Sequence, residues 1–195
     1  MSVVNVKFAG LGGTGVIKAS DVMAELVFEQ GYDVKKAEVH GMSQRGGDVQ
    51  SNLRISTERI HSDLIPLGGA DLVVSLEPME ALRYLPYLSR EGWIITNTVP
   101  FINIPDYPEK DRIDAELRSV RNLIAIDVDA IAKSILSPRS ANMVLLGATA
   151  AVLDILDPDC LREGIRRVFA RKGETVVDTN IKAFDAGFSF AVQNR

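Results

Sequence analysis

The chain has 195 residues and a formal net charge of −4, and 46% of its residues are hydrophobic. This composition is typical of a soluble globular protein, and the charge gives no general attraction to nucleic acid or to an anionic membrane. No apolar run is long enough to span a bilayer, and the N-terminus lacks the basic start and apolar centre of a signal peptide. We therefore expect residues 1–195 to form a single domain in the cytoplasm.

Cysteine and histidine are scarce. Cys160 is the only cysteine, so this chain by itself can form no internal disulfide and cannot ligate an iron–sulfur cluster with four cysteines. We expect a half-buried packing role for its side chain. The two histidines, His40 and His61, lie far apart and show no metal-ligand spacing, so we predict no metal site.

A glycine-rich loop near the N-terminus carries the first functional signal. Gly10-Leu11-Gly12-Gly13-Thr14-Gly15 follows the apolar run 3–9 and precedes residues 16–30, whose apolar side chains recur at helical spacing. The order is strand, glycine loop, helix, and the glycines match the G-x-G-x-x-G pattern of dinucleotide-binding proteins. We expect an anion at the helix N-terminus. The alternative is that the glycines only permit a close strand-to-helix crossing.

The next strand, 33–38, is predicted to complete a βαβ unit after a helix end at Gly31. In nicotinamide-binding proteins an acidic residue at the end of this strand holds the ribose hydroxyls, and Glu38 occupies about that position. Dinucleotide binding therefore stays open as an interpretation.

The segment 39–49 is an unusual loop with three glycines, a histidine and an arginine. Glycine is used where a backbone must approach something closely, so this composition suggests a shaped surface. Arg45 could pair with a phosphate or carboxylate, and His40 could exchange a proton near neutral pH. A tight turn with a solvated arginine is the plainer alternative.

The rest of the chain predicts an α/β fold, a Rossmann-like doubly wound, mostly parallel sheet with an inserted β-hairpin and a helical C-terminal part. We expect the hairpin to join strand 49–56 to residues 59–62. Glu77 is predicted to cap a helix that extends to Leu88. Asn97 and Thr98 end a strand where such sheets present ligand-facing groups. The further strands are 70–76, 92–97 and 123–127, and the further helices are 113–120, 128–136, 142–153, 159–171 and 175–192.

The helix 142–153 is apolar nearly all round, which is typical of a helix in a core or a subunit interface. Gly147 within it indicates that another element crosses closely.

Five blocks together resemble the gamma subunit of 2-oxoacid:ferredoxin oxidoreductases over essentially the whole chain, in particular the small beta subunit of the indolepyruvate enzymes. The most diagnostic block is His40-Gly41-Met42-Ser43-Gln44-Arg45-Gly46-Gly47, since the glycine fingerprint alone occurs in many unrelated families. The other four are residues 10–15, 96–98, 142–148 and 180–187.

The resemblance implies a complex that oxidatively decarboxylates a 2-oxo acid, with coenzyme A accepting the acyl group and ferredoxin the electrons. Indolepyruvate is favoured as substrate, with pyruvate, 2-oxoglutarate and branched-chain 2-oxo acids as alternatives. Thiamine diphosphate, magnesium and the iron–sulfur clusters would sit on partner subunits, so the chain would need no catalytic nucleophile of its own. It would help to bind coenzyme A and complete the interface with the active site. The cofactor-binding candidates are Gly10, Gly12, Gly13, Thr14, Gly15, His40, Ser43, Gln44, Arg45, Asn97 and Thr98.

Two alternatives remain. The glycine fingerprint and Glu38 also suit a free-standing NAD- or flavin-dependent oxidoreductase, although the chain lacks an obvious second substrate domain. A purely structural assembly subunit, whose glycine loop binds nothing, is the other.

Overall fold

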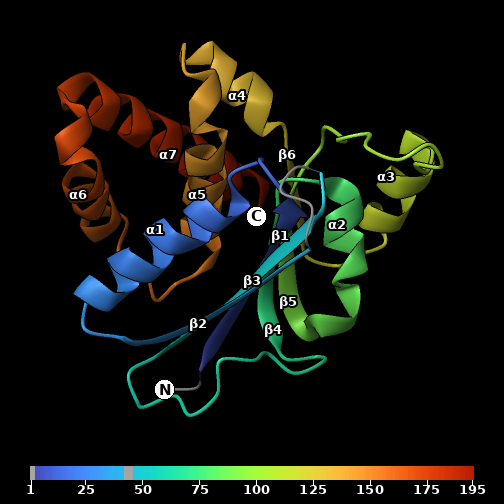
Figure 1. Cartoon of the computed structure of the whole chain (residues 1–195), viewed down its shortest axis with the longest axis horizontal. Coiled ribbons are helices and arrows are strands. Elements are labelled where there is room, and N and C mark those ends of the chain that lie inside the picture. The colour runs from blue at the N-terminus through green and yellow to red at the C-terminus, as the bar shows by residue number, and fades with distance from the viewer. Residues whose placement is uncertain (1–2, 42–45) are drawn as a thin grey trace.

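The computed structural model describes residues 3–41 and 46–195, and its centre is a six-stranded mixed sheet (Figure 1). The spatial order is β2-β3-β1-β4-β5-β6. β1, β4, β5 and β6 run parallel, whereas β3 is antiparallel to both of its neighbours. This arrangement confirms the predicted mostly parallel α/β class. The strands are β1 (Val4–Leu11), β2 (Asp33–His40), β3 (Asp48–Ser56), β4 (Ala70–Ser75), β5 (Leu88–Asn97) and β6 (Leu123–Ile126).

Helices cover both faces of this sheet (Figure 1). Successive side chains of a strand point to opposite faces, so in β1 Phe8 packs into the larger core under α1 and α5, while Ala9 packs into the smaller core under α2 and α3. None of the described helices is both long and apolar enough to cross a membrane. The helices are α1 (Val16–Glu29), α2 (Pro78–Arg83), α3 (Lys110–Arg118), α4 (Val128–Ser134), α5 (Ala141–Val152), α6 (Pro158–Phe169) and α7 (Glu174–Asn194), with short 3₁₀ turns η1 (Leu85–Tyr87), η2 (Pro138–Ser140) and η3 (Ala170–Lys172).

α5 lies in the core between the sheet and α7, which explains why it is apolar all round. A Cβ atom added to Gly147 of α5 would lie 1.9 Å from the carbonyl oxygen of Phe184, and one added to Gly187 of α7 would lie 1.8 Å from that of Val144. The two helices therefore touch backbone to backbone. This confirms the close crossing expected at Gly147 and places the helix in the core of the chain itself.

The inserted hairpin exists, but its predicted partner strand was wrong. β3 pairs with β2, and residues 59–62 form no strand. The backbone N–H of Ile60 instead donates to the carboxylate of Asp33, and the Ile60 side chain is buried. β3 is paired with β2 on one side and with β1 on the other, so no edge of β3 is left for the segment after Ser56 to join.

The hairpin also changes the expected βαβ unit, because β3 lies between β1 and β2. Glu38 is consequently one strand further from the glycine loop than the ribose-binding acid of a nicotinamide site. Its backbone pairs with Ser51, and its carboxylate forms an ion pair with Lys36. The position therefore offers no support for ribose recognition.

Two local expectations also differ from the structure. The helix predicted to reach Leu88 ends at Arg83, because Pro86 has no N–H with which to continue it, and Leu88 already begins β5. Cys160 is exposed and not half-buried, and its thiol contacts the Asp157 carboxylate at 3.6 Å near the start of α6.

Candidate functional site

The glycine loop joins β1 to α1 through two left-handed residues. Gly13 has φ +95° and Gly15 has φ +86°, which side chains other than hydrogen rarely allow. Gly10 serves close packing, because a Cβ there would stand 3.3 Å from Val16. Gly15 is the N-cap of α1, provides no side-chain cap, and is followed by a first turn without an acidic residue. The positive end of the helix dipole is thus left uncompensated.

Gly46 and Gly47, which lie directly before β3, bind to this loop. The Gly12 N–H donates to the Gly47 carbonyl oxygen at 2.8 Å, and the Gly46 N–H donates to the Gly12 carbonyl oxygen at 3.2 Å. The Asn103 amide donates to the Gly46 carbonyl oxygen at 2.6 Å. Hydrogen bonds therefore connect the glycine loop, Gly46 and Gly47, and the loop before α3.

These bonds narrow the set of donors that a ligand could use. The backbone groups of Gly12 are already hydrogen-bonded, and both the N–H and the hydroxyl of Thr14 donate to the Leu11 carbonyl oxygen, at 3.1 Å and 2.7 Å. Within the described part of the chain, the N–H groups of Gly13 and Gly15 and those of the first turn of α1 have no acceptor. An anion would bind to these groups.

A crevice of about 180 Å³ opens beside the loop, at the carboxyl ends of the parallel strands. It lies at the switch point of the sheet, where the helix after β1 covers one face and the helix after β4 the other. Thr14 and Asn97 both line it. Asn97 is fixed there, since its amide donates to Asp129 at 3.2 Å and its oxygen accepts the Val128 N–H at 3.3 Å.

Glu77 holds the outer wall of the crevice. Its carboxylate caps α2 by accepting the Glu80 N–H at 2.8 Å, which confirms the predicted capping role. It also accepts from the hydroxyl of Tyr107 and, at 3.4 Å, from the N–H of Phe101, although the side chain is completely buried. Burial, together with this hydrogen bond to Glu77, raises the pKa of Tyr107. This second role could not be predicted from local patterns, because Tyr107 is 30 residues away.

The other candidate residues are dispersed. His40 ends β2 with an exposed side chain, and Thr98 is half-buried, with its N–H donating to the Ile126 carbonyl oxygen at 3.1 Å. Neither lines the crevice. Ser43, Gln44 and Arg45 lie outside the described residues.

A cluster of titratable groups lies around the start of β3. Lys7 is buried in β1, where its ammonium donates to Asn52 at 2.9 Å and lies 4.1 Å from the ring centre of Tyr87. Burial lowers the pKa of Lys7 to about 8, although the carboxylate of Asp48 opposes this effect. Asp48 also accepts from the Tyr84 hydroxyl at 3.1 Å. The cluster thereby fixes β3 at its first residues, directly after Gly46 and Gly47.

Glu80 belongs to the same cluster and leads to a pH-dependent prediction. Burial raises its pKa to about 7, against the opposing effect of Arg83 at 3.0 Å. Because the pKa of Glu80 is higher in the folded state, its carboxyl group stabilises the fold at pH values below its ordinary pKa of 4.5. This stabilisation is lost as the pH rises through 7. Glu80→Gln should remove that loss, so its stability relative to the wild type should rise by roughly 1–2 kcal/mol between pH 4.5 and pH 8.

Urea unfolding at several pH values between 4.5 and 8 measures this effect. The exposed Glu116→Gln is the matched control, because it removes the same charge without removing a buried carboxyl group. If the stabilities of Glu80→Gln and the wild type changed in parallel with pH, burial would not raise the pKa of Glu80.

The described residues suit an anion better than a metal or a cluster. They contain no group of three or more metal-ligating side chains, and the single cysteine cannot supply the ligand set of an iron–sulfur cluster. The uncapped N-terminus of α1, in contrast, has the donors and the dipole that a phosphate group requires.

A six-stranded, mostly parallel α/β sheet with a glycine loop at its switch point has a Rossmann-like architecture. Comparison with known proteins shows the family to which the chain belongs. The model of the pyruvate ferredoxin/flavodoxin oxidoreductase family matches residues 5–190. The indolepyruvate oxidoreductase subunit IorB of Methanothermobacter thermautotrophicus is 37% identical over 97% of this chain and 98% of its own length. The chain belongs to the pyruvate ferredoxin/flavodoxin oxidoreductase family.

Solved structures share the fold. The gamma subunit of a keto/oxoacid ferredoxin oxidoreductase from Geobacter sulfurreducens superposes with a TM-score of 0.72 at 24% identity, over 97% of this chain and 99% of that one. A 2-oxoglutarate:ferredoxin oxidoreductase from Magnetococcus marinus, with coenzyme A bound, superposes with a TM-score of 0.77 at 23% identity, over 98% of this chain and 31% of that one.

Proposed function

We propose that this chain, as the gamma-type subunit of a 2-oxoacid:ferredoxin oxidoreductase, binds the phosphates of coenzyme A at the N-terminus of α1. The observation that carries the proposal is the uncapped first turn behind Gly13 and Gly15, with N–H groups that lack an acceptor among the described residues. An anion there gains both hydrogen bonds and the helix dipole. The Magnetococcus relative of this fold is a coenzyme A complex, which agrees with that choice of anion.

The neighbouring crevice suits the uncharged part of the same ligand. Asp129 lines it, so a second anionic group would be repelled, whereas an amide could donate to a carboxylate. With about 180 Å³ it is smaller than the pockets that enclose whole drug-sized ligands. The amide-bearing arm of coenzyme A would thus enter it only in part and continue toward a partner subunit.

Apolar side chains beside the crevice support such a partner. Val99 is 41% exposed, Phe101 49% and Ile102 71%, and Ile104 extends the same patch. Exposed apolar patches next to a site are typical of interfaces. We assign this patch to the subunit that holds thiamine diphosphate and magnesium. Partner chains would also hold the iron–sulfur clusters that pass electrons to ferredoxin, since this chain has one cysteine.

The reaction served by this subunit would be the coenzyme A-dependent oxidative decarboxylation of a 2-oxo acid. The name of the Methanothermobacter relative favours an aryl pyruvate such as indolepyruvate. Thiamine chemistry stabilises the acyl carbanion, so the contribution of this chain is to orient coenzyme A and to shield the site. Substrate choice would then rest mainly with the thiamine-bearing subunit.

Gly13→Ala tests the ligand site, and Gly31→Ala is its matched control. Both glycines have similar left-handed backbones, with φ +95° and +87°, and a Cβ at either would meet nothing within 4 Å. Both substitutions should therefore cost about 1 kcal/mol of stability. Only Gly13→Ala should weaken coenzyme A binding, by about tenfold, because its methyl group stands where the phosphate approaches.

Calorimetric titration of the complex with coenzyme A measures the difference, and a parallel titration of the lone chain with NAD examines the alternative. Equal coenzyme A affinity in both variants and the wild type would leave the glycine loop a purely structural role. Tight NAD binding by the lone chain would favour a free-standing dehydrogenase instead.

A further inference from the structure

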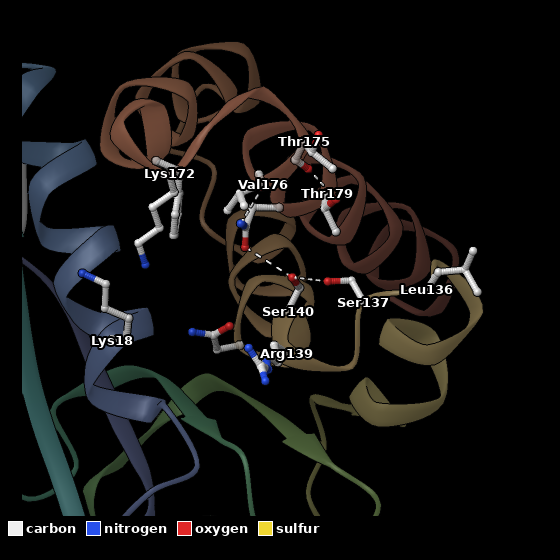
Figure 2. Close-up of a pocket in the computed structure, with 12 residues that line it drawn as sticks. Lys18, Leu136, Ser137, Arg139, Ser140, Lys172, Thr175, Val176 and Thr179 are labelled. Atoms are coloured by element: carbon white, nitrogen blue, oxygen red, sulfur yellow. Dashed lines mark hydrogen bonds between the residues drawn. The ribbon is translucent and has the colours of Figure 1, made fainter.

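A second pocket, larger than the crevice, lies on the helical side of the chain. Its volume is about 480 Å³, and it opens between α1, η2 and the start of α7 (Figure 2). Elements distant in sequence meet there, because residues of α1, η2, η3 and α7 all line the pocket. None of the candidate residues that the structure describes lines this pocket.

The charges around this pocket are all of one sign. Lys18 of α1, Arg139 of η2 and Lys172 of η3 line it, and no aspartate or glutamate does. In Figure 2 the ammonium groups of Lys18 and Lys172 point toward one another across the opening. Within residues 3–41 and 46–195, none of these three cations has an ion-pair partner, and Lys172 contacts only the Phe169 ring, at 5.3 Å.

Like charges from three separate elements repel one another unless an anion lies between them. Arg162, which also lies on the helical side of the chain, differs from them because it pairs with both Asp159 and Asp185. The pocket also offers neutral hydrogen-bonding groups from Asn142 and Thr175, and an apolar wall from Val176. Its volume matches that of small-molecule sites, which commonly lie between 300 and 1,000 Å³.

We propose that this pocket binds a small organic phosphate of nucleotide size, with the phosphates between Lys18, Arg139 and Lys172. The apolar wall would contact the organic part of the ligand. The phosphate could come from a free nucleotide or from the 3′-phosphorylated ADP end of coenzyme A. The second source is within reach of the glycine loop, because Asn142 lies 3.6 Å from where a Cβ on Gly15 would stand. The site does not depend on the proposed role of the glycine loop.

The double variant Arg139→Gln/Lys172→Gln tests this site, because both residues line the pocket and neither lines the crevice. Arg171→Gln is the control, since it removes an exposed charge next to Lys172 that does not line the pocket. The probes are ADP, coenzyme A and dephospho-coenzyme A, each titrated into the complex. The double variant should weaken ADP or coenzyme A binding by about tenfold or more, and Arg171→Gln should change it by less than about twofold.

The outcomes separate the two sources and the two proposals. ADP that binds alongside coenzyme A indicates a free nucleotide. A loss for coenzyme A but not for dephospho-coenzyme A indicates its 3′-phosphate. If the double variant binds all three probes as the wild type does, or if Arg171→Gln has the same effect, the pocket proposal is wrong. If Gly13→Ala leaves coenzyme A binding intact while the double variant reduces ADP binding, only the glycine-loop proposal fails.

Discussion

Gly187→Ala is expected to destabilise the fold by about 3 kcal/mol or more. The added methyl group would stand 1.8 Å from the Val144 carbonyl oxygen, which belongs to a helix backbone and cannot rotate away. α5 and α7 would have to separate along their whole contact, and α5 also packs on the sheet. Gly147→Ala should act in the same way from the other side, against the Phe184 carbonyl oxygen.

Urea unfolding, monitored by circular dichroism, measures this loss, and Gly164→Ala is the control. A Cβ on Gly164 of α6 would also lie 1.9 Å from its neighbour, but that neighbour is the Cδ2 methyl group of Leu26, which can change rotamer. The higher helix propensity of alanine offsets part of that cost, so Gly164→Ala should lose less than about 1 kcal/mol. Similar losses of stability in all three variants would show that the backbone contact between α5 and α7 is no less tolerant of a methyl group than a contact with a side chain.

Glu77→Ala should cost about 3 kcal/mol and loosen the outer wall of the crevice. The change removes the cap of α2, typically worth about 1 kcal/mol, and leaves the Tyr107 hydroxyl and the Phe101 N–H without their acceptor. Hydrogen exchange in the segment 98–109 should accelerate as this wall loses its anchor. Coenzyme A binding should weaken as well, because the wall borders the proposed site.

Asp127→Ala is the matched control for Glu77. Asp127 caps α4 with one hydrogen bond, to the Ala130 N–H at 2.7 Å. Its loss should cost about 1 kcal/mol and leave exchange in the segment 98–109 unchanged. Glu77→Gln should fall between the two, since its amide oxygen retains one acceptor. Equal effects of Glu77→Ala and Asp127→Ala would reduce Glu77 to an ordinary helix cap.

Local patterns sufficed for most of the fold. The strand, glycine loop and helix at residues 3–30 follow from hydrophobic periodicity and glycine spacing, and Gly147 marked the close helix crossing because its neighbours are all apolar. The resemblance of the five sequence blocks to gamma subunits agrees with the family match. These features are encoded by residues close in sequence.

Pairings between distant segments could not be predicted from local sequence patterns. The half-buried alternation of β3 shows that it is a strand but not that it inserts between β1 and β2. The hydrogen bonds of the Gly12 backbone depend on Gly46 and Gly47. The pocket proposed to bind a phosphate is lined by both Lys18 and Lys172, which lie far apart in the sequence. Such arrangements depend on tertiary packing. A hydrophobic repeat of two or 3.6 residues carries no information about which distant segments pack together.

The position of α5 and α7 has a consequence for the synthesis of the protein. All six strands precede residue 127, whereas the helix pair that buries Phe8 and Val74 on one face of the sheet lies between residues 141 and 194. A ribosome releases the sheet first, so the growing chain carries an incompletely covered apolar surface until α7 has emerged. A frameshift or premature stop near the 3′ end of the coding region would therefore yield a chain that chaperones bind and proteases degrade, rather than a folded subunit of lower stability.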